Sequence, residues 1–195
     1  MKAPKLETVT VDYLKSFGVE PHYMGLGVVK LPITPMNSFH FYCDQTEQIC
    51  DDPHTHRFGF TSTLVKGSME NLVYEARASD KETPYVLEYG QCEPNANMEI
   101  IQRNIEPLIT GRFITTQGSS YTLDSKCIHR IICLTDKVVT FLEKNPDDIL
   151  KAGRRLRDPG ENWFIVNDQE RFPCAFSQPK TPERCWEIIE YTLAD

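Results

Sequence analysis

Residues 53–67 combine two histidines with a strand-like run. His54 and His56 are separated by one residue, and the residues behind them, rich in Phe, Thr, Leu and Val, end at Gly67. Side chains alternate faces along a strand, so this spacing would place both imidazoles on one face. On a helix the same spacing would point the rings apart. The pattern therefore predicts a β-strand that carries two ligands for one metal ion.

A second stretch, residues 118–132, supplies a third histidine. Its residues indicate a strand, a turn and a second strand, and His129 begins the second strand. A metal site is preorganised when its ligands come from more than one element. We therefore predict His129 as the third ligand, beside His54 and His56.

The spacing in the first stretch resembles the first motif of the metal-binding cupins, the RmlC-like jelly-roll superfamily. That motif runs Gly, five residues, His-x-His, three or four residues, Glu, six residues, Gly. His54, His56 and Gly67 stand at matching positions, whereas Phe60 replaces the motif Glu and Gln48 replaces the first Gly. Phe60 cannot bind a metal, so the ligands that match are all histidines.

The second stretch is similar to the second cupin motif, which runs Gly, five residues, Pro-x-Gly, two residues, His. Gly118 and His129 keep this spacing, while Asp124 and Lys126 replace the turn Pro and Gly. The resemblance implies an all-β fold, a cupin-type double-stranded β-helix (jelly-roll) barrel. Residue patterns add a short N-terminal helix and a C-terminal helix.

Three histidines without a carboxylate resemble the cysteine-dioxygenase-like branch of the cupins. In that branch three histidines hold a mononuclear ferrous ion, and the open positions take a thiol substrate and dioxygen. The resemblance thus implies a non-haem Fe(II) dioxygenase that acts on a small molecule, with a thiol as the closest analogue. Imidazole nitrogen also suits other metals, so Zn, Ni and Mn remain alternatives to Fe(II).

Strand alternation names further residues of the expected pocket. Phe58, Phe60 and Ser62 would share the face of the first two histidines, and Leu123 would complete an apolar ring. Tyr121 could hold its phenol over the cavity as a catalytic group, or pack in the core with a satisfied hydroxyl. Glu70, on the next strand, could reach the pocket and replace the missing carboxylate ligand.

Other functions remain open at this point. Phe60 and the lost Gly and Pro positions favour a cupin that binds a small ligand or a protein partner without catalysis. A three-histidine zinc or nickel site could instead serve a hydrolase or isomerase, because zinc lowers the pKa of bound water. His40 could face the barrel interior as a further ligand or be a packed histidine, and Cys43 could be a soft ligand or a core thiol.

Composition limits the partners. The chain has 195 residues and a net charge of −7, which disfavours nucleic-acid binding. The one basic run, residues 151–157, is more typical of a solvated segment. No apolar run approaches the ~18 residues of a membrane span, and the N-terminus lacks an apolar signal core. We expect a cytoplasmic protein with a small-molecule ligand, no nucleic-acid or membrane partner, and possible homodimers.

The cysteines and the length support one domain in a reducing compartment. The seven cysteines show no CxxC pair, so they are expected to be small buried hydrophobes. We predict a single cupin domain over residues 1–195. Its barrel core would span about residues 27–143, and residues 144–195 would form a C-terminal extension.

Local patterns predict the elements in order. A helix capped by Thr10 or Asp12 should end at Gly18, and a helix over 182–193 should begin after Thr181. The expected strands include 27–31, 39–43, a hairpin of 57–66 with 69–77, 85–89, two strands joined near Pro107, and a short edge strand at 163–166. Residues 78–112 would be an extended hairpin over the barrel.

Overall fold

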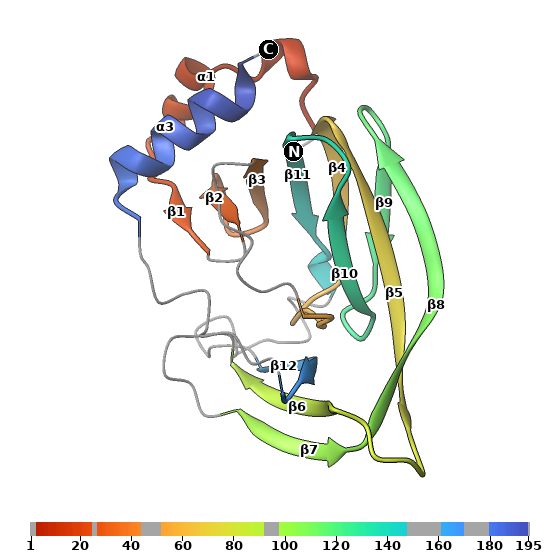
Figure 1. The fold of residues 1–195 in the computed structure, drawn as a ribbon. Helices are drawn as coiled ribbons and strands as arrows, with labels where there is room; N and C mark the ends of the chain where they lie inside the picture. The colour runs from red at the N-terminus through yellow and green to blue at the C-terminus, as the bar shows by residue number, and fades with distance from the viewer. Residues whose placement is uncertain are drawn as a thin grey trace.

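The computed structural model describes residues 3–24, 27–43, 52–91, 98–147, 161–169 and 180–194, and these residues are mostly antiparallel strands (Figure 1). The elements are η1 Leu6–Thr8, α1 Val11–Lys15, β1 His22–Tyr23, β2 Val28–Pro32, β3 Asn37–Cys43, β4 Phe60–Lys66, β5 Ser68–Ala78, β6 Tyr85–Gln91, β7 Glu99–Arg103, β8 Ile105–Thr116, β9 Ser120–Leu123, β10 Ile128–Cys133, β11 Lys137–Lys144, β12 Glu161–Asn167 and α3 Pro182–Leu193. The basic run 151–157 and Gln48 lie outside the described residues. Neither helix in the described part is long and apolar enough to cross a membrane.

Two layers of strands face each other. One layer is a six-stranded sheet in the order β1-β2-β3-β11-β4-β9. The other contains β8-β5-β10 and β7-β6-β12, joined by residues 53–56, which we call the histidine segment. His54 exchanges two backbone hydrogen bonds of 3.0 and 2.9 Å with His129 of β10, and Thr55 N donates to Trp163 O of β12 at 3.0 Å. The second layer therefore continues from β8 through the histidine segment to β7.

This strand order is that of a double-stranded β-helix. Along the chain, β3, β4, β9 and β11 belong to the first layer, in the order β3-β11-β4-β9. The histidine segment, β5, β8 and β10 belong to the second, and the chain passes between the layers repeatedly. The predicted all-β double-stranded β-helix (jelly-roll) fold is thus confirmed. β6 and β7 are an insertion between β5 and β8, and Figure 1 places them at the opposite end from the helices.

The predicted hairpin of residues 57–66 with 69–77 is wrong. β4 pairs with β11 and β9, whereas β5 pairs with β10 and β8, so the chain changes layers between them. Gly67 makes this crossing with a φ of 82°. A Cβ atom there would collide with the backbone oxygen of Lys137. Only glycine therefore fits this crossing without strain.

Two more boundaries differ from the sequence prediction. The chain turns between β7 and β8 at Asn104, whose φ is 54°, and not at Pro107, which lies inside β8 opposite Ala76. β8 is an edge strand, where a proline is tolerated. Residues 161–167 form β12, which is not an edge strand, because it pairs with β6 on one side and with the histidine segment on the other.

Helices cover one face of the six-stranded sheet (Figure 1). The strands that α3 covers send alternate residues to this face, including Phe39, Phe41 and Phe141, which are fully buried against Ile188 and Ile189 of α3. Both helices are capped as predicted: Thr10 accepts from Tyr13 N, and Thr181 accepts from Arg184 N. The opposite face of the sheet looks into the barrel, where its side chains meet those of the second layer.

Candidate metal centre

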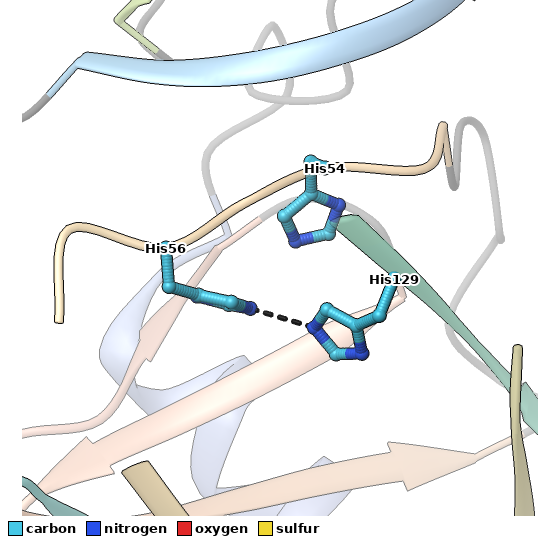
Figure 2. Close-up of side chains that lie close together, drawn as sticks. All are labelled: His54, His56 and His129. Atoms are coloured by element: carbon cyan, nitrogen blue, oxygen red, sulfur yellow. Dashed lines mark hydrogen bonds between the residues drawn. The ribbon is translucent and has the colours of Figure 1, made fainter. Parts of the chain in front are cut away.

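The three predicted histidines converge at one point inside the barrel. His54 and His56 come from the histidine segment and His129 comes from β10 (Figure 2). Each offers one ring nitrogen, and these three atoms lie within 4.8 Å of one another. Figure 2 shows the rings pointing toward one another, with the Nε2 atoms of His56 and His129 joined at 2.8 Å.

Backbone pairing explains why these residues meet. His54 and His129 form an antiparallel bridge with two hydrogen bonds, so their side chains are nearest cross-strand neighbours. Thr55 points the other way, because its buried hydroxyl accepts a hydrogen bond of 2.9 Å from Trp163 N. His56 therefore returns to the side of His54, as the spacing predicted, although the segment forms only isolated bridges at His54 instead of a regular strand.

The ring of His54 is oriented by the backbone. Its Nδ1 lies 2.8 Å from the carbonyl oxygen of Asp52. A carbonyl oxygen can only accept, so Nδ1 carries the proton and Nε2 of the neutral ring keeps its lone pair. Ligating histidines are usually held in this way by a hydrogen bond from their other ring nitrogen. The Nε2 lone pair of His54 is thus available to bind a metal ion.

Burial keeps the other two rings neutral. Desolvation, and then the nearby His54, lower the pKa of His129 to about 3. Desolvation is also the largest cause that places the pKa of His56 well below its usual value. Neutral imidazoles are the form that binds metals. Nδ1 of His129 is buried and has no hydrogen-bond partner among the described residues.

Two of the three ring nitrogens already have the spacing of ligands on one metal ion, and all three lie within 4.8 Å of one another. Metal–nitrogen bonds of about 2.0–2.1 Å at right angles would place two nitrogens about 2.9 Å apart. The Nε2 atoms of His56 and His129 are 2.8 Å apart, which matches adjacent positions of one coordination sphere. Three protein ligands leave further positions open for other molecules, as catalytic metals require. The cluster can therefore bind a metal ion.

Phe60 occupies space beside the cluster. Its ring meets the His56 ring edge-on, with centroids 4.8 Å apart and planes at 77°. The cluster contains no carboxylate among the described residues. Glu70, the predicted substitute, is not in it: its carboxylate pairs with Arg112 Nε at 3.1 Å, and it alternates along β5 with the buried Met69 and Asn71. Because neighbouring residues of β5 face opposite sides of the sheet, the Glu70 side chain points away from the histidines.

A cavity of about 100 Å³ opens beside the three histidines. A water needs about 10–15 Å³ by this measure, so there is room for roughly seven to ten waters or one small molecule. Among the predicted pocket residues, Phe60, Ser62 and Tyr121 line it. Phe58 does not, and its ring lies under Lys144 Nζ at 4.8 Å; Leu123 packs in the adjoining core.

Tyr121 keeps its proton over the ordinary pH range. Burial raises the pKa of this phenol to about 12, although a hydrogen bond with Ser62 acts in the opposite direction. The hydroxyl also points to Met69 Sδ at 3.9 Å. Tyr121 is therefore a neutral hydrogen-bond donor at the cavity wall.

The positions of His40 and Cys43 show whether either residue belongs to the metal site. His40 does face the interior and lines the cavity, but its Nε2 lies 3.1 Å from Ser38 Oγ and it is not in the three-histidine cluster. Burial lowers the pKa of His40 to about 3, with Lys30 as the next cause. Cys43 is buried in the core beneath α3, on the other face of the sheet, and is not a ligand.

Sequence reasoning missed several residues of the wall. Ile131 and Cys133 line the cavity because they follow His129 at intervals of two along β10, a signal that alternation could have supplied. Val28 and Thr140 also line it, and their positions depend on the register between strands far apart in sequence. That register has no local signal.

Comparison with known proteins adds likenesses of architecture. No protein-family model and no curated protein matches the chain. Among solved structures, it resembles an RmlC-like cupin from Shewanella frigidimarina, with a TM-score of 0.32, 14% identity, and coverage of 67% of this chain and 88% of the other. The chain also resembles KdgF from Halomonas sp., with a TM-score of 0.32, 13% identity, and coverage of 67% of this chain and 92% of KdgF.

A hydroquinone 1,2-dioxygenase from a Sphingomonas species is also similar, with a TM-score of 0.30 and 9% identity. The match covers 56% of this chain and only 59% of the dioxygenase. At these TM-scores and identities, the similarities do not indicate what activity this chain has. The strand order and the histidine geometry of this chain define a jelly-roll barrel with a candidate metal centre.

Proposed function

We propose that this chain binds one ferrous ion through His54, His56 and His129 and oxidises a small molecule with dioxygen. The observation that supports it most strongly is the convergence of three imidazoles beside a cavity, two of them kept neutral by burial, with no carboxylate in the cluster among the described residues. A ferrous ion held there would supply the one-electron chemistry that lets dioxygen react with an organic substrate.

The protein's own residues have three tasks in this proposal. The three rings hold the ion, and the hydrogen bond from His54 Nδ1 to Asp52 O fixes one of them in place. Phe60, Ile131 and Leu142 present apolar surface to the cavity and limit the water around the reacting groups. Tyr121 donates a hydrogen bond to a polar group of the bound substrate, since its phenol stays protonated.

A thiol remains the proposed reactive group of the substrate, on the basis of the three-histidine pattern. The cavity is small, and its wall is mostly apolar and aromatic with a few polar groups, including Ser62 and Thr140. Such a wall suits a molecule of few heavy atoms with an apolar middle. Homodimer formation, a cytoplasmic location and the absence of nucleic-acid and membrane partners stay predictions from the sequence.

Metal content tests the proposal directly. Protein purified after anaerobic loading with iron should contain about one iron per chain by mass spectrometry, and His54→Ala and His129→Ala should each lose it. His22→Ala, on the exposed side of β1, is the matched control and should keep its iron. Full occupancy in the His129→Ala protein would overturn the ligand assignment.

Phe60 favours a second candidate, a barrel that binds a small ligand without redox chemistry. Its ring stands beside His56, where the cupin motif has a carboxylate. Iron-loaded protein that consumes no oxygen with any thiol would favour this candidate. About one zinc or nickel per chain would keep the site and point to a hydrolase or isomerase, because such a metal can activate water.

A further inference from the structure

An asparagine on β5 is buried among apolar side chains. Asn71 is fully buried, and neither its Nδ2 nor its Oδ1 has a hydrogen-bond partner among the described residues. The residues opposite it on the two adjoining strands are Ile131 of β10 and Phe113 of β8. A buried amide without hydrogen bonds destabilises the folded state, whereas an apolar side chain of similar shape would not. The presence of Asn71 here therefore indicates a task other than packing.

The register of β5 and β10 puts Asn71 on the same face as His129. Ile131 lies opposite Asn71, and His129, two residues before Ile131, lies opposite Val73. Opposed residues of antiparallel strands share a face, and so do residues two apart along one strand. Ile131 and His129 both line the cavity, so this face is the inner one. Asn71 is therefore a diagonal cross-strand neighbour of a proposed metal ligand.

His129 also has a buried polar atom without a partner. Its Nε2 points into the cluster, 2.8 Å from Nε2 of His56, and Figure 2 shows its Nδ1 on the side of the ring away from His56. This Nδ1 has no hydrogen-bond partner among the described residues. A neutral ring that binds a metal through Nε2 carries its proton on Nδ1. That N–H group needs an acceptor inside the barrel.

Asn71 provides the acceptor that lies within reach. In the described part of the chain, two buried side-chain oxygens have no partner, Asn71 Oδ1 and Asn162 Oδ1. Asn162 belongs to β12, so two strand spacings of about 4.8 Å each separate its strand from β10. Asn71 is only one strand away. Diagonal neighbours have Cβ atoms less than about 7–8 Å apart, and the two side chains with a hydrogen bond of about 2.9 Å can span that gap.

We propose that Asn71 is a positioning residue for the metal centre: its Oδ1 accepts a hydrogen bond from Nδ1 of His129 and holds that ring with Nε2 toward the ion. A rotation of the Asn71 side chain brings the two groups together. Asp52 O holds the ring of His54 in the same way, at 2.8 Å from its Nδ1. A carboxamide suits this task because it accepts a hydrogen bond without adding a charge. The inference rests on the proposed function and adds a residue that orients one ligand.

The tautomer of His129 tests the inference without any metal. Long-range proton–nitrogen correlation spectra of the metal-free chain at pH 7 distinguish a ring protonated on Nδ1 from one protonated on Nε2. We expect the Nδ1–H form in the unaltered chain and in Asn71→Asp, which keeps an acceptor oxygen. Asn71→Leu has no acceptor, so its His129 should carry the proton on Nε2 and donate to His56. An Nε2–H form in the unaltered chain, or an Nδ1–H form in Asn71→Leu, would overturn the proposal.

Ferrous-ion affinity provides a second readout. Loss of the hydrogen bond to a ligating histidine typically weakens metal binding about 10–100-fold. Competition with a chelator under anaerobic conditions should show this loss in Asn71→Leu, while Asn71→Asp should bind at least as tightly as the unaltered chain. The urea midpoint of metal-free Asn71→Leu should not fall, because leucine leaves no buried N–H group unpaired once His129 changes tautomer. A lower midpoint with unchanged affinity would indicate a purely structural residue and overturn the proposal.

Asn37→Leu is the matched control. Asn37 is also buried, but it lies two residues before Phe39 on β3, on the face of the six-stranded sheet that turns away from the cavity. This variant should keep the tautomer of His129 and the ferrous-ion affinity of the unaltered chain. An equal loss of affinity in Asn37→Leu would show that the effect is not specific to Asn71 and would overturn the proposal.

The two proposals fail separately. An unaltered chain that binds no ferrous ion, but whose His129 changes tautomer in Asn71→Leu, loses the proposed function and keeps the role of Asn71. A chain that binds the ion and consumes oxygen, with the same tautomer and affinity in folded Asn71→Leu, does the reverse.

Discussion

Replacing Lys30 by methionine should stabilise the folded protein at neutral pH. The substitution keeps an unbranched apolar stem on β2 and removes the ammonium group. That group is partly buried, and burial together with the charges of Lys144 and Arg57 lowers its pKa from 10.5 to about 8. The folded state therefore disfavours the charged form of Lys30. Removing the ammonium group should stabilise the folded protein relative to the unfolded one.

The magnitude follows from this pKa. Each tenfold change in acidity corresponds to about 1.4 kcal/mol, so the drop from 10.5 to about 8 corresponds to about 3 kcal/mol. Solvent screening of the exposed part of the side chain reduces this to about 2 to 3 kcal/mol. We expect Lys30→Met to raise the free energy of unfolding by about that amount at pH 7.

The pH dependence has a definite sign. Below pH 8 Lys30 is charged in the folded and in the unfolded state, and the buried charge destabilises the folded state by its full amount. Between pH 8 and 10.5 the folded chain releases this proton while the unfolded chain keeps it, so stability rises with pH. The advantage of Lys30→Met should thus shrink to about 1 kcal/mol at pH 9.5.

Urea unfolding of both proteins at pH 7 and pH 9.5, with metal removed from both, would measure this difference. Taking the difference between the two proteins cancels the titration of all other groups. A Lys30→Met protein that is no more stable at pH 7, or whose advantage does not change with pH, would refute the electrostatic reasoning.

Three further predictions concern the crossing, the last helix and the cavity. Gly67→Ala should cost more than about 2 kcal/mol in unfolding experiments, because its Cβ would strike the backbone of Lys137; Gly118→Ala, with a φ of 83° but open space around it, should cost only about 1–2 kcal/mol. Equal losses of unfolding free energy in Gly67→Ala and Gly118→Ala would contradict the expected clash at Gly67. Lys66→Met should lose about 1 kcal/mol, since Lys66 Nζ donates to the carbonyl oxygens of Thr192 and Leu193 at 3.1 and 3.2 Å; an exposed Lys81→Met should lose almost nothing. Tyr121→Phe should keep the iron but lower oxygen consumption at least about tenfold, and a turnover rate equal to that of the unaltered chain would exclude a hydrogen bond from Tyr121 to the reacting substrate.

The sequence was most informative where interactions are local. The spacing of His54 and His56 follows from strand alternation, and the caps at Thr10 and Thr181 need only the next few residues. These features therefore could be predicted from short windows. The two cupin-like spacings add the third histidine, because they relate segments that the jelly-roll pairs with each other.

The errors concern long-range pairing. A hairpin was the natural interpretation of the residues around Gly67, because two strands joined by a glycine turn usually pair. In this fold the partners of β4 and β5 come from later in the chain, and they draw the two strands into opposite layers. Glu70 was misplaced for the same reason, because its partners Ile132 and Ile114 come from later strands.

The position of β12 has a consequence for the order in which the protein can mature. The histidine segment is held on one side by β10 and on the other by Trp163 and Ile165 of β12, far downstream. During synthesis, most of the barrel can emerge from the ribosome and pair before that strand exists. Until it docks, one edge of the segment has no partner. The candidate metal centre should therefore be the last part of the barrel to become rigid, and any ion should bind there only after β12 has docked.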